Sequence, residues 1–257
     1  MQYRIIVSSS KGGVGKSTTS ALLAVSLAAR GKRVLLLDLD LGTRCLDMFF
    51  GVEDSTVCDF ADVYKKRVEP RRATVFLDGG TDGTLFFVAS SLTLTPDEVE
   101  KDRLAATAEE IADEVLAEYV ICDTAGAVIP PMLAEWANLG LICSTQMPAS
   151  IRGAEATGKR LREAGLTAQR LIVTSFDYRE AKSGIRSGLL GLIDGSSIRA
   201  IGVVPYDREL MISQEHGALP PKNSKAVIAY DNIAARLCGE ERRLFYGMGR
   251  MKGKNAL

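Results

Sequence analysis

The chain has 257 residues, 46% of them hydrophobic, and its 32 Lys and Arg residues balance 32 Asp and Glu residues. This length and apolar content suit one doubly wound α/β domain, and the zero net charge provides no overall field toward nucleic acid, which disfavours DNA as a partner. Five cysteines without C-x-x-C or C-x-C spacing disfavour a disulfide framework or a zinc site, and no run of about 18 apolar residues could span a membrane, so we expect a cytoplasmic protein.

Short apolar runs rich in Val, Ile and Leu alternate with longer stretches of helical periodicity along the chain. This alternation predicts an α/β fold with a doubly wound, mostly parallel sheet flanked by helices, whose ligands bind at the carboxyl ends of the strands. A short strand at 74–77 is expected to form a hairpin with the run that begins at Leu85. We expect the other strands at 3–8, 33–38, 85–89, 119–123, 139–144, 170–174 and 198–204, and helices at 16–30, 46–50, 57–66, 96–116, 131–137, 151–164, 183–192, 207–215 and 226–236.

A phosphate-binding loop follows the first strand. Its glycines let the backbone turn N–H groups toward a polyphosphate, Lys16 can reach the β and γ oxygens, and the Ser17 hydroxyl can hold Mg²⁺. The loop therefore predicts ATP and Mg²⁺ as ligands. Its residues are Lys11, Gly12, Gly13, Val14, Gly15, Lys16, Ser17 and Thr18.

The first glycine of the usual pattern G-x-x-x-x-G-K-[ST] is replaced by Ser10, and a second lysine, Lys11, lies inside the loop. Because the backbone already surrounds the phosphates there, we expect the Lys11 ammonium to point away from its own nucleotide. This suggests a second nucleotide that faces Lys11 across a homodimer interface.

Carboxylates end two of the expected strands. Asp38 and Asp40 follow the second strand, where one could hold a water of the metal and the other the attacking water, although an Asp in this position can also merely cap the next stretch of backbone. A later apolar run ends in Asp123, the Walker B pattern, which would hold Mg²⁺ through water. Gly126, which has no Cβ, could let a backbone N–H approach the γ-phosphate as a switch.

These motifs together resemble the deviant Walker A ATPases of the MinD/ParA family, and its MinD branch most closely. The resemblance is carried by the loop with Lys11, by the segment from Asp38 to Gly51, and by Asp123 with Thr124, and it extends over almost the whole chain. It implies an ATPase that dimerises on ATP, binds an anionic membrane surface reversibly and regulates the placement of the division site. The partners that it implies are a division inhibitor and an ATPase-stimulating protein.

The resemblance also implies roles for individual positions. By it, Lys11 would reach the partner's nucleotide, Thr18 would touch the α-phosphate and Asp40 would orient the attacking water. The other implied roles are β- and γ-phosphate binding for Lys16, Mg²⁺ ligation or support for Ser17, Asp38 and Asp123, proximity to adenine for Pro205 and Asp207, and two switches at 38–47 and 123–127.

Some positions depart from the family pattern. The second switch lacks the usual proline after Thr124, and Gly153 replaces the acidic residue that usually follows the arginine matching Arg152. Two other classes stay open: a DNA-partitioning ATPase of the ParA type, which Asp177 and Arg179 favour, and a metal-cofactor maturation ATPase, which the missing paired cysteines disfavour.

The last 16 residues form a basic tail with five cations and no acidic side chain. On a helix, Leu244, Phe245, Met248 and Met251 would share one face, as in helices that lie in a membrane interface. The alternatives are a disordered basic tail or a last helix packed on the domain. We therefore expect a P-loop ATPase domain at 1–241 and an amphipathic tail at 242–257 that attaches the protein to the inner face of the cell membrane.

Overall fold

The computed structural model describes residues 2–77, 83–124 and 128–244. Four of the predicted functional positions, Gly126, Phe245, Met248 and Met251, lie outside these ranges. No helix in the described ranges is long and apolar enough to cross a membrane.

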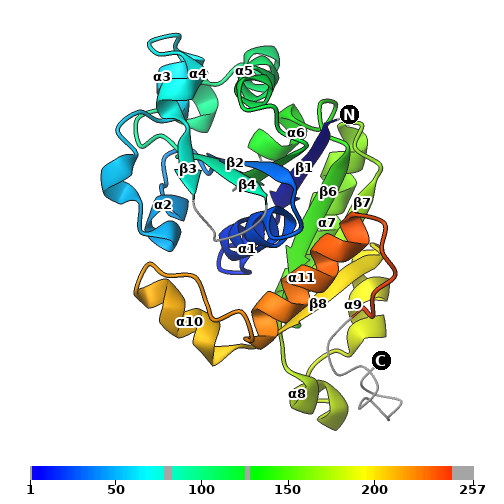
Figure 1. Ribbon diagram of the computed structural model, residues 1–257. Coiled ribbons are helices and arrows are strands. Elements are labelled where there is room, and N and C mark those ends of the chain that lie inside the picture. The colour runs from blue at the N-terminus through cyan, green and yellow to red at the C-terminus, as the bar shows by residue number, and fades with distance from the viewer. Residues whose placement is uncertain (1, 78–82, 125–127, 245–257) are drawn as a thin grey trace.

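Eight strands of the described chain form one sheet in the order β3-β4-β2-β5-β1-β6-β7-β8 (Figure 1). All neighbouring strands are parallel except the β3–β4 pair, which is the hairpin predicted from the sequence. The mostly parallel, doubly wound α/β fold is therefore confirmed. The strands are β1 Tyr3–Ser8, β2 Arg33–Leu39, β3 Val75–Leu77, β4 Thr84–Val88, β5 Tyr119–Thr124, β6 Leu139–Ser144, β7 Gln169–Phe176 and β8 Ala200–Pro205.

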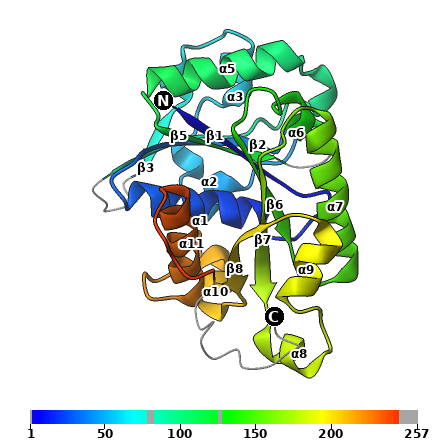
Figure 2. The same ribbon diagram turned by 90° about the vertical axis from the view of Figure 1, so that its right-hand side faces the viewer.

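Helices cover both faces of the sheet and bury its alternate side chains in two core clusters (Figure 2). One cluster contains residues of α1, α2 and α11, and the other contains residues of α3, α5, α6, α7 and α9. The helices are α1 Lys16–Ala28, α2 Leu46–Phe50, α3 Phe60–Tyr64, α4 Pro70–Ala73, α5 Lys101–Glu114, α6 Ile129–Met132, α7 Pro148–Glu163, α8 Tyr178–Ser183, α9 Leu189–Ser196, α10 Arg208–Glu215 and α11 Lys225–Leu237.

The single helix expected from Pro96 is interrupted. Thr95 and Glu98 form a capping box around a short 3₁₀ turn, after which Val99 and Glu100 are extended, and α5 begins only at the following residue. The local capping contacts stabilise a turn that the apolar periodicity could not reveal.

The helix expected at 183–192 is two helices. Gly184 ends α8 in the left-handed conformation with φ 78°, and Gly188 precedes α9 with extended backbone. Glycine favours the left-handed end at Gly184 because it has no Cβ to clash in that conformation.

The central strand β1 lies between β5 and β6. From β1 the chain goes first to β2, on the β5 side, and only later crosses to β6, on the opposite side. The carboxyl end of β1 is therefore the point at which the strand order reverses, the usual ligand site of open α/β sheets. The phosphate-binding loop lies there, directly before α1.

Candidate nucleotide site

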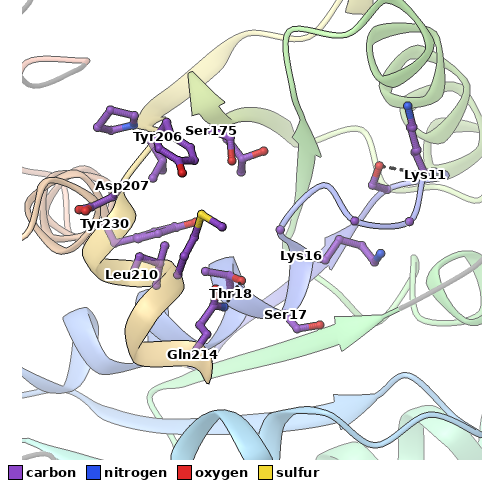
Figure 3. Close-up of a pocket in the computed structure, with 18 of the residues that line it drawn as sticks. Lys11, Lys16, Ser17, Thr18, Ser175, Tyr206, Asp207, Leu210, Gln214 and Tyr230 are labelled. Atoms are coloured by element: carbon purple, nitrogen blue, oxygen red, sulfur yellow. Dashed lines mark hydrogen bonds between the residues drawn. The ribbon is translucent and has the colours of Figure 1, made fainter. Parts of the chain in front are cut away.

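A pocket with a volume of about 690 Å³ opens at the carboxyl end of the sheet (Figure 3). It lies between the phosphate-binding loop, the ends of β7 and β8, and α10, and its volume is typical of small-molecule sites. The structure brings together there most of the residues predicted from separate motifs. These are Lys11, Gly12, Gly13, Gly15, Lys16, Ser17, Thr18, Asp40, Pro205 and Asp207.

The loop keeps its shape through glycine and through contacts to neighbouring elements. Gly13 and Gly15 have φ of 71° and 82°, in the left-handed region that a side chain would disfavour. The Val14 side chain is buried in the core, and its carbonyl oxygen accepts a hydrogen bond of 2.7 Å from Thr174 Oγ1 at the end of β7. Only the backbone of Val14, and not its side chain, can therefore contact a bound nucleotide.

Asp38 and Asp123 lie behind the loop as register partners on β2 and β5. The carboxylate of Asp38 accepts backbone N–H groups of Asp40, at 3.1 Å, and Leu46, at 3.4 Å, so it organises the segment after β2 as a capping residue would. Asp123 accepts a hydrogen bond of 2.8 Å from Ser20 Oγ on α1. Hydrogen bonds thus connect Asp38 to the segment after β2, and Asp123 to α1, the helix that carries Ser17.

Burial makes these carboxylates unusually basic. Desolvation, opposed by hydrogen bonds from Ser17 and Ser20, raises the pKa of Asp123 to about 6. Desolvation and the neighbouring Asp123 raise the pKa of Asp38 well above its usual range. Burial also raises the pKa of Asp40, although the Lys16 ammonium acts against this shift. A cation beside these groups would offset the unfavourable free energy of burying their negative charges close together.

The oxygen donors of this site fit Mg²⁺. The Ser17 hydroxyl and the carboxylates of Asp38 and Asp123 are the hard oxygen ligands that this ion prefers, and Ser17 lines the pocket. The described residues contain no group of three or more His, Cys, Asp and Glu side chains arranged to enclose a metal. Mg²⁺ usually keeps several waters and takes phosphate oxygens as further ligands, so it needs few ligands from the protein.

Lys11 differs from Lys16 in direction. Figure 3 shows its side chain running away from Lys16 and toward α7. Gly153 of α7 faces it, and a Cβ placed on Gly153 would lie 3.8 Å from the Cβ of Lys11. The glycine therefore leaves space beside Lys11 where a side chain would contact it.

Asp207 and Pro205 lie at the opposite end of the pocket. Both oxygens of Asp207 are engaged, because Oδ1 accepts the N–H of Glu209 at 3.0 Å and Oδ2 accepts the N–H of Ala226 at 2.8 Å. The carboxylate joins the first turns of α10 and α11. Asp207 therefore shapes this end of the pocket through the backbone that it holds.

Several residues at the site were not predicted from the sequence. Ser20 lies one helical turn after Lys16, a spacing that could have indicated it, but its contact with Asp123 depends on the packing of α1 against β5. The Tyr230 hydroxyl is 2.8 Å from Thr19 Oγ1, and Gln214 Nε2 donates to Thr18 Oγ1 at 2.8 Å. No local motif marks Tyr230 or Gln214.

Two other predictions receive a structural account. Asp177, which favoured the ParA type, caps α8 by accepting the N–H groups of Arg179, at 2.8 Å, and Glu180, at 3.1 Å. Leu244, which was predicted to join the apolar face of the tail, is half-buried against the core, and its carbonyl oxygen accepts the N–H of Val203 at 3.3 Å. Within the described part of the tail, Leu244 thus packs on the edge strand β8, whereas Arg242 and Arg243 are exposed.

Comparison with known proteins identifies the family. The profile of the CobQ/CobB/MinD/ParA nucleotide binding domain matches residues 5–220. The chain belongs to this family. It is 32% identical over 246 residues to the septum site-determining protein MinD of Bacillus subtilis, covering 93% of this chain and 90% of that relative. The MinD/ParA resemblance drawn from the motifs is therefore confirmed.

Solved structures agree with a MinD-type member of the MinD/ParA family. The MinC:MinD cell division protein complex of Aquifex aeolicus contains a chain with a TM-score of 0.85 and 28% identity, covering 95% of this chain and 98% of that one. MinD of Pyrococcus horikoshii, complexed with Mg-ADP, has a TM-score of 0.78 at 19% identity, with 92% and 96% covered, which supports the fold. The chain is thus a MinD-type member of a family of nucleotide-binding ATPases.

Proposed function

We propose that this MinD/ParA family member is a Mg²⁺-dependent ATPase that dimerises on ATP and regulates division-site placement from the membrane. The observation that carries the proposal is the convergence of Lys16, Ser17 and Asp40 on one pocket, with Asp123 directly behind the loop. The Mg-ADP bound by MinD of Pyrococcus horikoshii supports the same ligands for this chain.

In this proposal, hydrolysis depends on positioning and charge neutralisation. The Lys16 ammonium binds the β- and γ-phosphates, and Ser17 and Asp123, with Asp38, hold the metal and its waters. When bound, Mg²⁺ would neutralise the charge that develops on the phosphate oxygens. The Asp40 carboxylate lines the pocket beside Lys16 and orients the attacking water.

Dimerisation would use Lys11. Because its side chain is directed away from Lys16, its ammonium is free to meet the phosphates of a nucleotide in a second copy. Two facing lysines would then stabilise a dimer only while the γ-phosphate is present.

Membrane attachment would use the tail, with the protein otherwise in the cytoplasm. Each cation near an anionic leaflet contributes about 1 kcal/mol, so one tail binds weakly and two tails in a dimer bind much better. Since Leu244 packs against the core, Phe245, Met248 and Met251 form the anchoring face, which Leu244 joins only if it leaves β8. The MinC:MinD complex of Aquifex aeolicus supports a division inhibitor as partner, and a second partner would stimulate hydrolysis.

Cosedimentation with anionic liposomes or with DNA, in ATP and in ADP, tests the proposal. Two truncations, removing 242–257 or only 245–257, separate loss of the anchor from loss of the Leu244 contact. We expect ATP-dependent binding to liposomes that both truncations abolish. Binding that persists without residues 245–257 would reject the tail as anchor, and ATP-dependent binding to DNA alone would favour the ParA type.

A further inference from the structure

The helix α10 lies across the pocket from the phosphate-binding loop. The sequence predicts no functional role for the residues of this helix. Leu210, Met211 and Gln214 line the pocket at positions i, i+1 and i+4, which share one face of a helix (Figure 3). None of the residues of α10 is buried, and Met211 is 51% exposed. The helix therefore turns Met211 and Gln214 toward the ligand space, whereas Leu210 lines the pocket and also packs against a core cluster.

Contacts at its two ends hold α10 in this position. Asp207 caps its first turn, and after its last turn Gly217 packs against Gly51, the residue that ends α2. A Cβ on Gly217 would lie only 2.9 Å from the carbonyl oxygen of Met48, so the two backbones are in close contact. Between these ends, the Gln214 side chain reaches across to α1.

Gln214 Nε2 donates a hydrogen bond of 2.8 Å to Thr18 Oγ1. A threonine hydroxyl has one proton and two acceptor positions. When Gln214 donates to the oxygen, the proton of Thr18 must point to a different acceptor. Thr18 lies in the first turn of α1 and lines the pocket, so a phosphate oxygen of a bound nucleotide is the acceptor available to it.

We propose that Gln214 is a positioning residue, which orients the Thr18 hydroxyl proton toward the α-phosphate while Leu210 and Met211 form the apolar wall beside the ribose and base. This role rests on the proposed nucleotide site and extends it to α10. A glutamate at this position could only accept the proton and would add a negative charge near the phosphates. Nucleotide affinity then depends on Gln214 donating the hydrogen bond to Thr18, and not only on a hydrogen bond being present between them.

Calorimetric titration of the full chain with Mg-ADP tests the role. The variants are Gln214→Met, Gln214→Glu, Thr18→Val and the double variant Gln214→Met with Thr18→Val, and Glu215→Gln on the exposed side of α10 is the control. We expect Gln214→Met to weaken ADP binding about 3- to 10-fold, as for the loss of one hydrogen bond. Gln214→Glu should weaken it at least about tenfold further, because like charges then lie close together.

The double variant separates positioning from a purely structural role. If Gln214 acts through Thr18, the double variant should bind ADP about as weakly as Thr18→Val alone, while thermal unfolding without nucleotide stays close to that of the wild type. Losses that add, or a Gln214→Met variant within twofold of the wild type, would overturn the role and leave the ATPase proposal intact. A wild-type protein that binds no ADP would instead reject the proposed function, and this role with it.

Discussion

Asp38 on β2 and Asp123 on β5 lie side by side as register partners, and each is only 1% exposed. Two carboxylates held this way without a cation repel each other and lose their hydration. The arrangement suits a site completed by a divalent ion, and it has consequences that can be measured without any assay of turnover.

The stability of the nucleotide-free protein should fall as pH rises from about 4 to about 7. Burial raises the pKa of Asp123 from 3.8 to about 6, so the folded state binds more protons than the unfolded state in this window. The stabilising contribution is present below the unfolded pKa and is lost as pH passes the folded pKa, at a total cost of about 3 kcal/mol. Urea unfolding across this range, compared between wild type and Asp123→Asn, isolates the effect; equal pH slopes for the two proteins would contradict it.

Mg²⁺ should stabilise the ADP-bound protein more at pH 7.5 than at pH 5. Metal binding requires deprotonated ligands, and protons compete for Asp38 and Asp123 because burial has raised the pKa of both. The shift in melting temperature between ADP with Mg²⁺ and ADP with chelator measures this effect. Asp123→Asn should lose most of the shift, and a shift that is independent of pH would argue against these carboxylates as the metal's partners.

Lys11→Ala should bind ATP with nearly unchanged affinity but lose ATP-driven dimerisation, because its side chain is directed away from Lys16. Sedimentation velocity in ATP and in ADP measures the dimer, and fluorescence titration measures nucleotide binding. Lys16→Ala is the matched control, since it should lose nucleotide binding itself. If the dimers of Lys11→Ala are as stable as those of the wild type, Lys11 does not contribute to the dimer interface.

Asp40→Ala should reduce ATP hydrolysis by on the order of 100-fold or more and trap the ATP-bound dimer, because the attacking water loses its acceptor. The pocket keeps its phosphate ligands, so ATP affinity should change little. Phosphate release together with sizing in ATP checks both effects, and normal turnover would exclude Asp40 from the mechanism.

The Gly51–Gly217 contact could not be read from the chain, although both glycines are visible in it. Each has a positive φ, of 64° and 56°, and the two meet only because α10 folds back beside α2. Similarly, the sequence predicts one helix from Pro96, whereas the capping box of Thr95 and Glu98 encloses a short turn that ends before the extended residues Val99 and Glu100. Hydrophobic periodicity indicates which face of an element is buried, but it does not indicate where local hydrogen bonds interrupt a helix.

The sequence by itself determined the phosphate-binding loop, the alternation of strands and helices, and the acids that end β2 and β5, because each depends on residues that are neighbours in the chain. Only the tertiary structure decided that Ser20 bonds to Asp123, that Gln214 reaches Thr18, and that Leu244 packs on β8. These contacts join residues far apart in the chain, and they exist because the order of strands in the sheet brings particular helix faces and strand ends together. The order of the strands in the sheet cannot be predicted from a local sequence pattern.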